Sequence, residues 1–184
     1  MLTAGQAAIR ALQDTESDMN LLYRWLNDEQ VLTYLDGTGS GFTRDQIEVK
    51  YGPRARGEDY VIPCIIEHDA TPIGYLQYYP LLENERIEYE ADKVGLHYGI
   101  DLFIGEPDYW DRGIGTIAVR TITSYLFEAR QADSIYIDPA AWNSRAIRCY
   151  EKSGFVKVSR IVRELCEGKY LDVQVMRMID RQRG

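Results

Sequence analysis

The sequence contains few of the residues that form metal sites, disulfide frameworks and nucleophile–histidine pairs. Its three cysteines, Cys64, Cys149 and Cys166, have no metal-ligand spacing and form no even-numbered set, which is typical of a reducing compartment. The two histidines, His68 and His97, have no serine, cysteine or ligand cluster at a useful spacing. We therefore interpret the cysteines as core thiols and both histidines as surface or structural residues.

Long apolar runs and an excess of positive charge are also lacking. No apolar run reaches the ~20 residues that span a bilayer, and the N-terminus lacks the basic-then-apolar order of a signal peptide, so we expect a cytoplasmic protein. The 29 acidic and 21 basic residues give a formal net charge of −8, which argues against nucleic acid or an anionic membrane as a partner. Such a charge favours a polycationic partner, although solubility alone also accounts for it.

The chain of 184 residues, 45% of them apolar, is long enough for a single globular domain over residues 1–184 with its own core. Hydrophobic periodicity predicts both strands and helices within it. Strands are predicted at 8–12, 60–67, 72–79, 98–104, 134–138, 155–164 and 169–178. Helices are predicted after Thr15, over 28–35, after Thr43, from the glycines at 113–115 to Ala129, and over 143–153. The segments 36–41 and 82–93 are predicted to be loops, and residues 68–71 a hairpin turn.

A glycine-containing loop lies between the strand at 98–104 and the long helix that follows. It reads Tyr109-Trp110-Asp111-Arg112-Gly113-Ile114-Gly115-Thr116. At a helix start several backbone N–H groups lack a partner and carry the positive end of the helix dipole behind them, so such a position binds phosphate. Gly113 and Gly115 let a phosphate approach the backbone, and Arg112 and Thr116 add a charge and a donor. Alternatively, the glycines serve only to pack the helix start. The helix face predicted to be buried consists of Ile117, Ala118, Thr121, Ile122, Tyr125, Leu126 and Ala129.

The segment 82–93 is rich in carboxylates. It contains Glu83, Glu85, Glu88, Glu90 and Asp92, opposed by Arg86 and Lys93. One interpretation is a solvated connection between strands. The other is the rim of a site for a cationic ligand, because clustered carboxylates focus a negative potential over a neighbouring cleft. On the second interpretation Glu83 is a candidate substrate-binding residue.

A second motif follows the strand at 134–138. It reads Asn143-x-x-Ala146-x-x-x-Tyr150-x-x-x-Gly154-Phe155, which is an N-capped helix with a glycine at its C-terminal end. Together with Arg112-Gly-Ile-Gly-Thr earlier in the chain, this motif resembles the coenzyme A loop and the next helix of the GNAT N-acetyltransferase superfamily. More narrowly, three segments are similar to the aminoglycoside 6′-N-acetyltransferases, and the similarity covers about residues 9–178. These segments are Ile73-Gly-Tyr-Leu-Gln77-Tyr, Tyr98-Gly-Ile-Asp101-Leu-Phe-Ile-Gly-Glu-Pro-Asp-Tyr-Trp110 and Arg145-Ala-Ile-Arg-Cys-Tyr-Glu-Lys-Ser-Gly-Phe155.

The resemblance implies an α/β fold of the GNAT type, which has a mixed, strongly twisted sheet of about six to seven strands with helices on both faces. It implies that acetyl-CoA lies between the strands at 98–104 and 134–138, and that the chemistry needs no metal. The implied cofactor-binding residues are Arg112, Gly113, Ile114, Gly115 and Thr116 at the pyrophosphate, Asn143 at the pantetheine arm, and Leu102, Phe103 and Ile104 beside the thioester. The N–H groups of Leu102 and Phe103 would polarise the thioester carbonyl. Trp110 departs from the superfamily loop, which usually begins with Gln or Arg.

The implied catalytic residues are Asp101 and Tyr150. Tyr150 matches the position whose hydroxyl protonates the leaving thiolate. A phenol with a pKa of about 10 is a slightly uphill donor to a thiolate of about 8.5, so its contribution is a hydrogen bond that strengthens as the sulfur becomes charged. The alternative is that Tyr150 only packs.

Asp101 matches the carboxylate proposed as the base. An alkylammonium and a carboxylate differ by about 6 pKa units, so direct deprotonation would cost roughly 8 kcal/mol. We therefore expect Asp101 to bind and orient the amine, and to accept its proton once attack has made the nitrogen acidic. A structural ion pair is the alternative.

The predicted reaction transfers the acetyl group of acetyl-CoA to the 6′-amine of a polycationic aminoglycoside by direct attack in a ternary complex, and its consequence is antibiotic resistance. The candidate substrate-binding residues are Tyr34, Asp36, Gln77, Tyr78, Glu83, Asp101, Asp138 and Glu167. Of these, Gln77 and Tyr78 are predicted to face the sugar rings. Two other functions stay open: acetylation of another amine, such as a protein N-terminus, a polyamine or a siderophore precursor, and a non-catalytic acetyl-CoA-binding module. The sequence does not decide between a monomer and a homodimer.

Overall fold

The computed structural model describes residues 1–35, 41–164 and 170–180, and within them the chain forms one sheet of eight strands in the order β1-β2-β3-β4-β5-β6-β8-β7. The strands are β1 (Leu2–Ala4), β2 (Ala7–Ala11), β3 (Ile62–His68), β4 (Thr71–Pro80), β5 (His97–Ile104), β6 (Ser134–Ile137), β7 (Val156–Glu164) and β8 (Tyr170–Ile179). Neighbouring strands are antiparallel except for the parallel pair β5 and β6. The predicted mixed sheet is confirmed. It has one strand more than the upper prediction, because β1 is too short to show a period of two.

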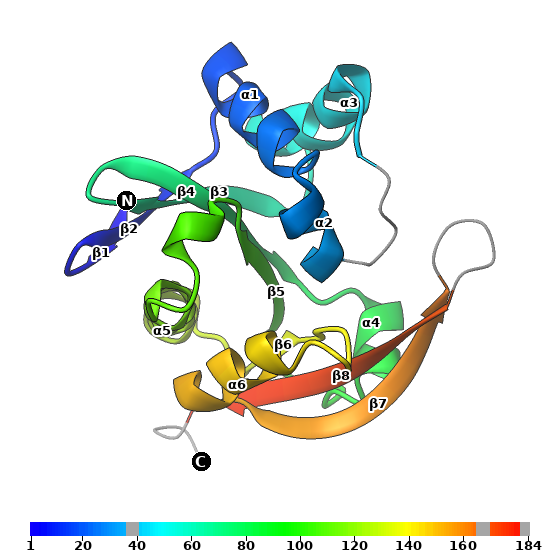
Figure 1. Ribbon diagram of the computed structural model, residues 1–184. Helices are drawn as coiled ribbons and strands as arrows, with labels where there is room; N and C mark the ends of the chain where they lie inside the picture. The colour runs from blue at the N-terminus through cyan, green and yellow to red at the C-terminus, as the bar shows by residue number, and fades with distance from the viewer. Residues whose placement is uncertain (36–40, 165–169, 181–184) are drawn as a thin grey trace.

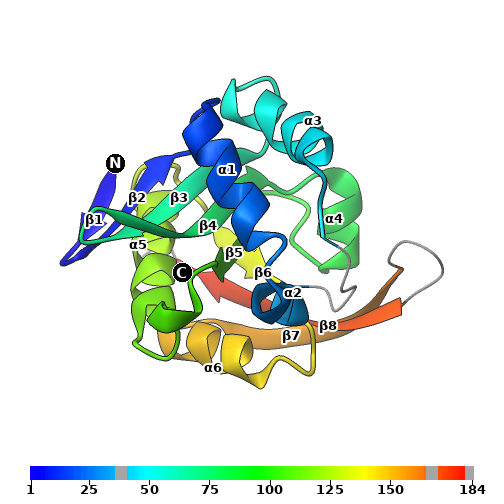
Figure 2. The same ribbon diagram turned by 45° about the horizontal axis from the view of Figure 1, so that its top comes forward.

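Helices cover both faces of this sheet, as predicted (Figure 1). The helices are α1 (Glu16–Trp25), α2 (Glu29–Leu35), α3 (Arg44–Ala55), α4 (Glu83–Glu88), α5 (Ile114–Glu128) and α6 (Ser144–Ser153), with a 3₁₀ turn over Pro107–Tyr109. On one face α1 and α3 pack on β3 and β4 through a core that includes Leu22, Trp25 and Ile47. On the other face α5 and α6 build the larger core with Ile100 and Ile122 (Figure 2).

The buried side of α5 differs from the predicted face. Ala118, Ile122 and Leu126 are buried as predicted, but Ile117 is 40% exposed and Ala129 is also exposed. Val119 and Thr123 are buried in their place. The reason is that α5 contacts β1, β2, β5, β6 and α6, so its buried stripe is centred between neighbours on two sides rather than on the sheet alone.

Two predicted loops also need correction. The acidic segment contains the helix α4, whose start is capped by Glu85, since its Oε2 accepts a hydrogen bond from the Leu82 N–H at 2.8 Å. A helix of six residues is too short to show a clear helical period in sequence. In the hairpin between β3 and β4, His68 belongs to β3, and the turn consists of Asp69 and Ala70, which both have positive φ.

The parallel pair determines where a cavity can form. Strand β5 pairs with β6 only at His97, Tyr98 and Gly99, whereas β4 pairs with β5 as far as Ile104. Beyond Gly99 the two parallel strands diverge, so the second half of β5 has a strand partner on one edge and none described on the other. The predicted acetyl-CoA position lies at this divergence.

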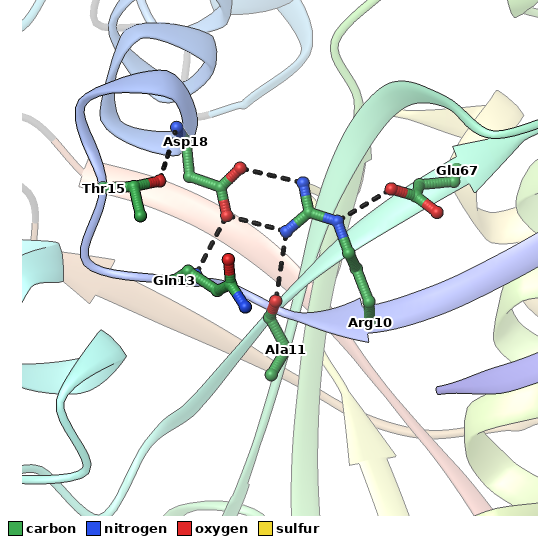
Figure 3. A network of polar contacts seen from close by, with 6 residues as sticks. All are labelled: Arg10, Ala11, Gln13, Thr15, Asp18 and Glu67. Carbon is green, nitrogen blue, oxygen red and sulfur yellow. Dashed lines mark hydrogen bonds and ion pairs between the residues drawn. The ribbon is translucent and has the colours of Figure 1, made fainter.

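A buried ion-pair network joins the first half of the sheet to α1 (Figure 3). Arg10 on β2 donates to both carboxylate oxygens of Asp18 at 2.7 and 2.8 Å, and its Nε donates to Glu67 on β3 at 2.7 Å. Asp18 also accepts the Gln13 N–H at 2.9 Å, while its own N–H is capped by Thr15. Asp18 is 4% exposed, so its charge depends on these partners.

We expect Asp18 to make stability depend on acid pH. Burial alone would raise its pKa, but the hydrogen bonds from Arg10 and from the Gln13 N–H outweigh burial and hold the pKa below the ordinary 3.8. A lowered carboxyl pKa stabilises the fold above the ordinary value, and this contribution is lost as pH falls through the lowered value. Between pH 5 and pH 2 the melting temperature should therefore fall less steeply in Asp18→Asn than in the wild type. If the melting temperature fell equally steeply with pH in both proteins, Asp18 would not be the source of this pH dependence.

Candidate active site

A cavity of about 500 Å³ opens where β5 and β6 diverge. Its wall is built from the second half of β5, the loop and first turn of α5, the segment after β6, helix α6 and the end of α2. The cavity thus combines the two sequence motifs, because both helix starts point at the gap between the two strands. Predicted site residues that line it are Tyr34, Asp101, Leu102, Phe103, Ile104, Gly113, Ile114, Gly115, Thr116, Asp138, Asn143 and Tyr150.

Backbone direction along β5 decides which amides face the gap. The Gly105 N–H donates to Ile73 on β4 at 2.8 Å, so the odd-numbered residues of β5 direct their backbone groups at β4. Leu102 and Ile104 consequently direct theirs at the gap, and the Ile104 carbonyl accepts the Trp110 Nε1–H there at 2.8 Å. The prediction that Phe103 also presents its N–H to a thioester is therefore wrong, since consecutive amides of a strand point to opposite edges.

The helix start of α5 has the geometry expected of an anion site. Gly113 is its N-cap and has a φ of 77°, a left-handed conformation that glycine adopts at little cost. Gly113, Ile114, Gly115 and Thr116 all line the cavity, and the first N–H groups of a helix lack intrahelical partners and have the positive end of the helix dipole behind them. Thr116 Oγ1 lies 3.4 Å from Cys149 Sγ on α6, and the two helices meet at this point. Arg112 is exposed, lies 5.4 Å from the Tyr109 ring centroid, and is not part of the cavity wall.

An aromatic–guanidinium stack closes one side of the cavity. The Arg145 guanidinium lies 4.2 Å from the ring centroids of both Tyr34 and Trp110, and these two rings meet edge to face at 5.5 Å. Such contacts hold a cation in place and keep its charge. Sequence reasoning treated Trp110 only as a departure from a family pattern and missed Arg145. The available signal was an arginine two residues after the helix cap Asn143.

Asn143 is buried and its side chain is already engaged. Its Oδ1 accepts the Ala146 N–H at 3.1 Å, which caps α6, and its Nδ2 donates to the Tyr34 carbonyl at 3.4 Å. The same residue therefore starts α6 and ties it to α2 across the cavity.

Tyr150 lies on the buried face of α6 and is 7% exposed. Burial raises the pKa of its hydroxyl well above the ordinary value, with smaller contributions from Cys149, Asp101 and Asp138. The hydroxyl is therefore a neutral donor at physiological pH. Burial likewise raises the pKa of the neighbouring Cys149 thiol, which makes that thiol a weak nucleophile.

Asp101 is held by the neighbouring strand. Gln77 on β4 is its register partner, and the Gln77 Nε2–H donates to Asp101 Oδ2 at 2.7 Å. Both side chains project from the face of the sheet that α1 and α3 cover. Tyr78 projects from the opposite face into the core with Tyr125, so its predicted contact with a sugar ring is wrong, because successive strand residues alternate in direction.

Asp138 directly follows β6 and lines the same cavity as Asp101. The Tyr89 hydroxyl donates to its Oδ2 at 3.0 Å, and the Tyr89 ring stacks on Tyr136. The ring of Tyr79 packs close to the β5 backbone, since a Cβ at Gly99 would come within 2.5 Å of this ring. Burial and then the charge of Asp101 raise the pKa of Tyr79, so it too stays a neutral phenol.

Of the other predicted substrate residues, only Glu83 lies within the described part of the chain. Glu83 is exposed at the start of α4 and does not line the wall. Asp36 and Glu167 lie outside the described residues. His97 is a structural residue, as predicted: it is 2% exposed and its Nδ1 lies 2.7 Å from Ser134 Oγ.

Within residues 1–35, 41–164 and 170–180, His, Cys, Asp and Glu side chains form no group of three or more that could hold a metal ion. None of the helices in the same ranges combines the length and apolar content that a membrane crossing requires.

Comparison with known proteins agrees with this geometry. Residues 14–163 match the model of the acetyltransferase (GNAT) domain. The chain belongs to the GNAT family of acetyltransferases. It is 31% identical over 170 residues, 92% of this chain and 84% of the relative, to the aminoglycoside N(6′)-acetyltransferase type 1 of Klebsiella pneumoniae.

Solved structures give the same family. The aminoglycoside acetyltransferase AAC(6′)-Ib in complex with coenzyme A superimposes with a TM-score of 0.74 at 27% identity, covering 96% of this chain and 95% of that one. The same enzyme in complex with ribostamycin and coenzyme A gives a TM-score of 0.75 at 26% identity, covering 96% and 94%. The predicted GNAT fold is thereby confirmed.

Proposed function

We propose that this protein transfers the acetyl group of acetyl-CoA to the 6′-amine of aminoglycoside antibiotics, by direct attack in a ternary complex, and so confers resistance. The observation that carries the proposal is one cavity, at the divergence of β5 and β6, whose wall includes the Asp101 carboxylate, the Tyr150 hydroxyl and the start of α5. The relatives named aminoglycoside N(6′)-acetyltransferase supply the substrate class.

Acetyl-CoA suits the cavity because each part of it finds a chemically matched group. Its pyrophosphate is anionic, and the first N–H groups of α5 bind anions. Arg145 lines the same wall and adds a fixed positive charge. The Leu102 N–H faces the gap between the strands and is the β5 amide placed to polarise a thioester carbonyl there.

The reaction needs one bond formed and one broken. The amine nitrogen of the drug bonds to the carbonyl carbon, the carbon–sulfur bond breaks, and the sulfur leaves with the electron pair. Asp101 binds and orients the drug as its ammonium. The neutral amine, formed when the ammonium releases one proton to solvent water, is the form that attacks, and Asp101 then takes a second proton from the nitrogen, which attack has made acidic. Tyr150 donates a hydrogen bond to the sulfur as negative charge develops on it.

The test is an acetyl-CoA-dependent assay at low salt on a small aminoglycoside panel, read by mass spectrometry. We expect one added acetyl group on drugs with a 6′-amine and none on a drug that lacks it. No transfer to any panel member would overturn the proposal. A polyamine and a peptide N-terminus in the same assay decide whether another amine is the substrate, and bound acetyl-CoA without transfer to any amine would indicate a binding module.

We expect Tyr150→Phe to lower kcat by about 10-fold to 100-fold, the loss of one hydrogen bond to a charged group. The affinity for acetyl-CoA should stay close to the wild-type value, because the ring that packs on Phe155 is kept. Steady-state kinetics and calorimetric titration of acetyl-CoA measure the two quantities. Tyr23→Phe, on α1 away from the cavity wall, is the matched control. An unchanged kcat in Tyr150→Phe would mean that this tyrosine only packs.

We expect the KM for an aminoglycoside to rise steeply with salt, while the KM for acetyl-CoA rises less. The acceptor is a polycation held by carboxylates, and each exposed ion pair contributes about 1 kcal/mol or less and is screened above about 0.1 M salt. Initial rates at several sodium chloride concentrations measure both constants. An equal rise of both KM values with salt would contradict the electrostatic role given to Asp101 and Asp138.

We also propose a cytoplasmic location. Cys64 and Cys149 are free thiols in the structure, and burial raises the pKa of Cys64 to about 12, which keeps it unreactive.

A further inference from the structure

The Gln77 side chain makes three hydrogen bonds on the face of the sheet beside the cavity. Its Oε1 accepts from Arg54 Nη1 at 2.9 Å and from the Tyr75 hydroxyl at 2.8 Å. Its Nε2 donates to Asp101 Oδ2 at 2.7 Å. The side chain thus connects α3, two positions of β4 and the carboxylate on β5.

The hydrogen-bonding groups around Gln77 determine which way its amide is oriented. A guanidinium has only donors, so the atom of Gln77 that faces Arg54 must be the oxygen. The nitrogen then faces Asp101 and can only donate to it. A carboxylate that receives a short N–H···O bond from a fixed donor loses rotational freedom, and its second oxygen keeps one direction.

The burial of the two donors to the Gln77 oxygen supports this orientation of the amide. Tyr75 is 3% exposed, and the Arg54 side chain is 18% exposed and also pairs with Asp59 at 3.3 Å. Both groups that hold the Gln77 oxygen are therefore themselves held. Gln77 does not line the cavity, whereas Asp101 does.

We infer that Gln77 is a positioning residue, which with Arg54 and Tyr75 fixes the Asp101 carboxylate toward the acceptor amine. The predicted contact of Gln77 with a sugar ring is replaced by this role. The inference rests on the proposed function, since it assigns to Gln77 a part in orienting the amine that Asp101 binds. A misplacement of about 1 Å in such a group costs on the order of 100-fold in rate.

The kinetic test compares Gln77→Leu and Gln77→Glu with the wild type on a 6′-amino aminoglycoside. Leucine removes all three hydrogen bonds. Glutamate keeps the size and the acceptors for Arg54 and Tyr75, but has no N–H for Asp101. We expect both variants to lower kcat by about 10-fold to 100-fold and to change either KM by less than about threefold.

Gln46→Leu is the matched control. In the wild type, Gln46 Oε1 accepts the Thr43 N–H at 2.7 Å in the capping box of α3, far along the helix from Arg54. It should lower the melting temperature and leave kcat unchanged, which separates loss of a glutamine hydrogen bond in general from loss of this one.

Three results would overturn the inference. A raised KM for the drug with an unchanged kcat would mean that Gln77 binds the sugar directly. Wild-type kcat in Gln77→Glu would mean that the N–H donor is not needed. Unchanged kinetics in both variants, with an active wild type, would mean that Asp101 is held by other groups.

A spectroscopic measurement tests the inference independently of the proposed function. If the wild type acetylates no aminoglycoside, the proposed function fails, and the Gln77 contact is read from side-chain amide signals in a ¹⁵N–¹H spectrum. The signal absent from Gln77→Leu identifies Gln77. We expect Asp101→Ala to shift this signal, and an unshifted signal would overturn the inference without reference to any substrate.

Discussion

Asp101→Asn is expected to lower kcat for a 6′-amino aminoglycoside by about 10²-fold to 10⁴-fold, the range for loss of a positioned proton acceptor. The neighbouring Gln77 determines how the asparagine side chain is oriented. Because Gln77 presents an N–H to residue 101, the new asparagine must turn its oxygen toward Gln77. Its NH₂ group then faces the cationic amine, so an attraction is replaced by a repulsion.

Steady-state kinetics on both substrates measure this effect, with calorimetric binding of acetyl-CoA to confirm an intact fold. Acetyl-CoA affinity should be nearly unchanged, because the proposed function assigns Asp101 to the acceptor amine and not to acetyl-CoA. Asp45→Asn, an exposed position on α3, is the control and should keep wild-type kinetics. A kcat within about threefold of the wild type in Asp101→Asn would show that the carboxylate is structural and would remove the central residue of the mechanism.

Arg10→Ala is expected to lower the free energy of unfolding by about 3–5 kcal/mol, the cost of leaving a buried charge without its partner. The carboxylates of Asp18 and Glu67 have side chains only 6% and 13% exposed, so water cannot replace the guanidinium (Figure 3). In a domain of this size the melting temperature falls by about 2–4 °C for each kcal/mol, so a drop of about 6–20 °C is expected.

Denaturant unfolding of matched variants checks this prediction. Arg56→Ala is the control, since Arg56 pairs with Asp14 and Glu58 at an exposed position and its loss should matter much less. The double variant Arg10→Met, Asp18→Leu should recover part of the stability, because it leaves one carboxylate, Glu67, without the guanidinium instead of two. If Arg10→Ala and Arg56→Ala were equally stable, the network would not be the link between β2, β3 and α1 that its geometry indicates.

Most of the fold could be predicted from local sequence patterns. The start of α5 followed from Gly113 and Gly115 after an apolar strand, and the start of α6 followed from Asn143, because caps and left-handed turns depend on residues only a few positions apart. The missed elements, β1 and α4, have three and six residues, and segments so short carry no measurable period.

The cavity wall could be predicted only in part. Asp101 and Tyr150 both line it as the family resemblance implied, and each sits on an element that the sequence located. The prediction for Tyr78 was wrong because its side chain faces the core on the side of the sheet opposite to Gln77, and Glu83, on α4, is not part of the wall. Such errors arise where a residue is assigned to a site by type before the direction of its side chain is known.

The sequence by itself determined the strand–loop–helix order, the two glycine and asparagine caps and hence the family, since these depend on interactions between residues close in the chain. Only the tertiary structure decided which distant groups meet. The register of β4 on β5 places Gln77 opposite Asp101, and α3 then brings Arg54 to the same amide. The divergence of β5 from β6 after Gly99 opens the cavity. Pairings across 23 and 24 residues are set by sheet register and helix packing, which leave no periodic signal in the sequence.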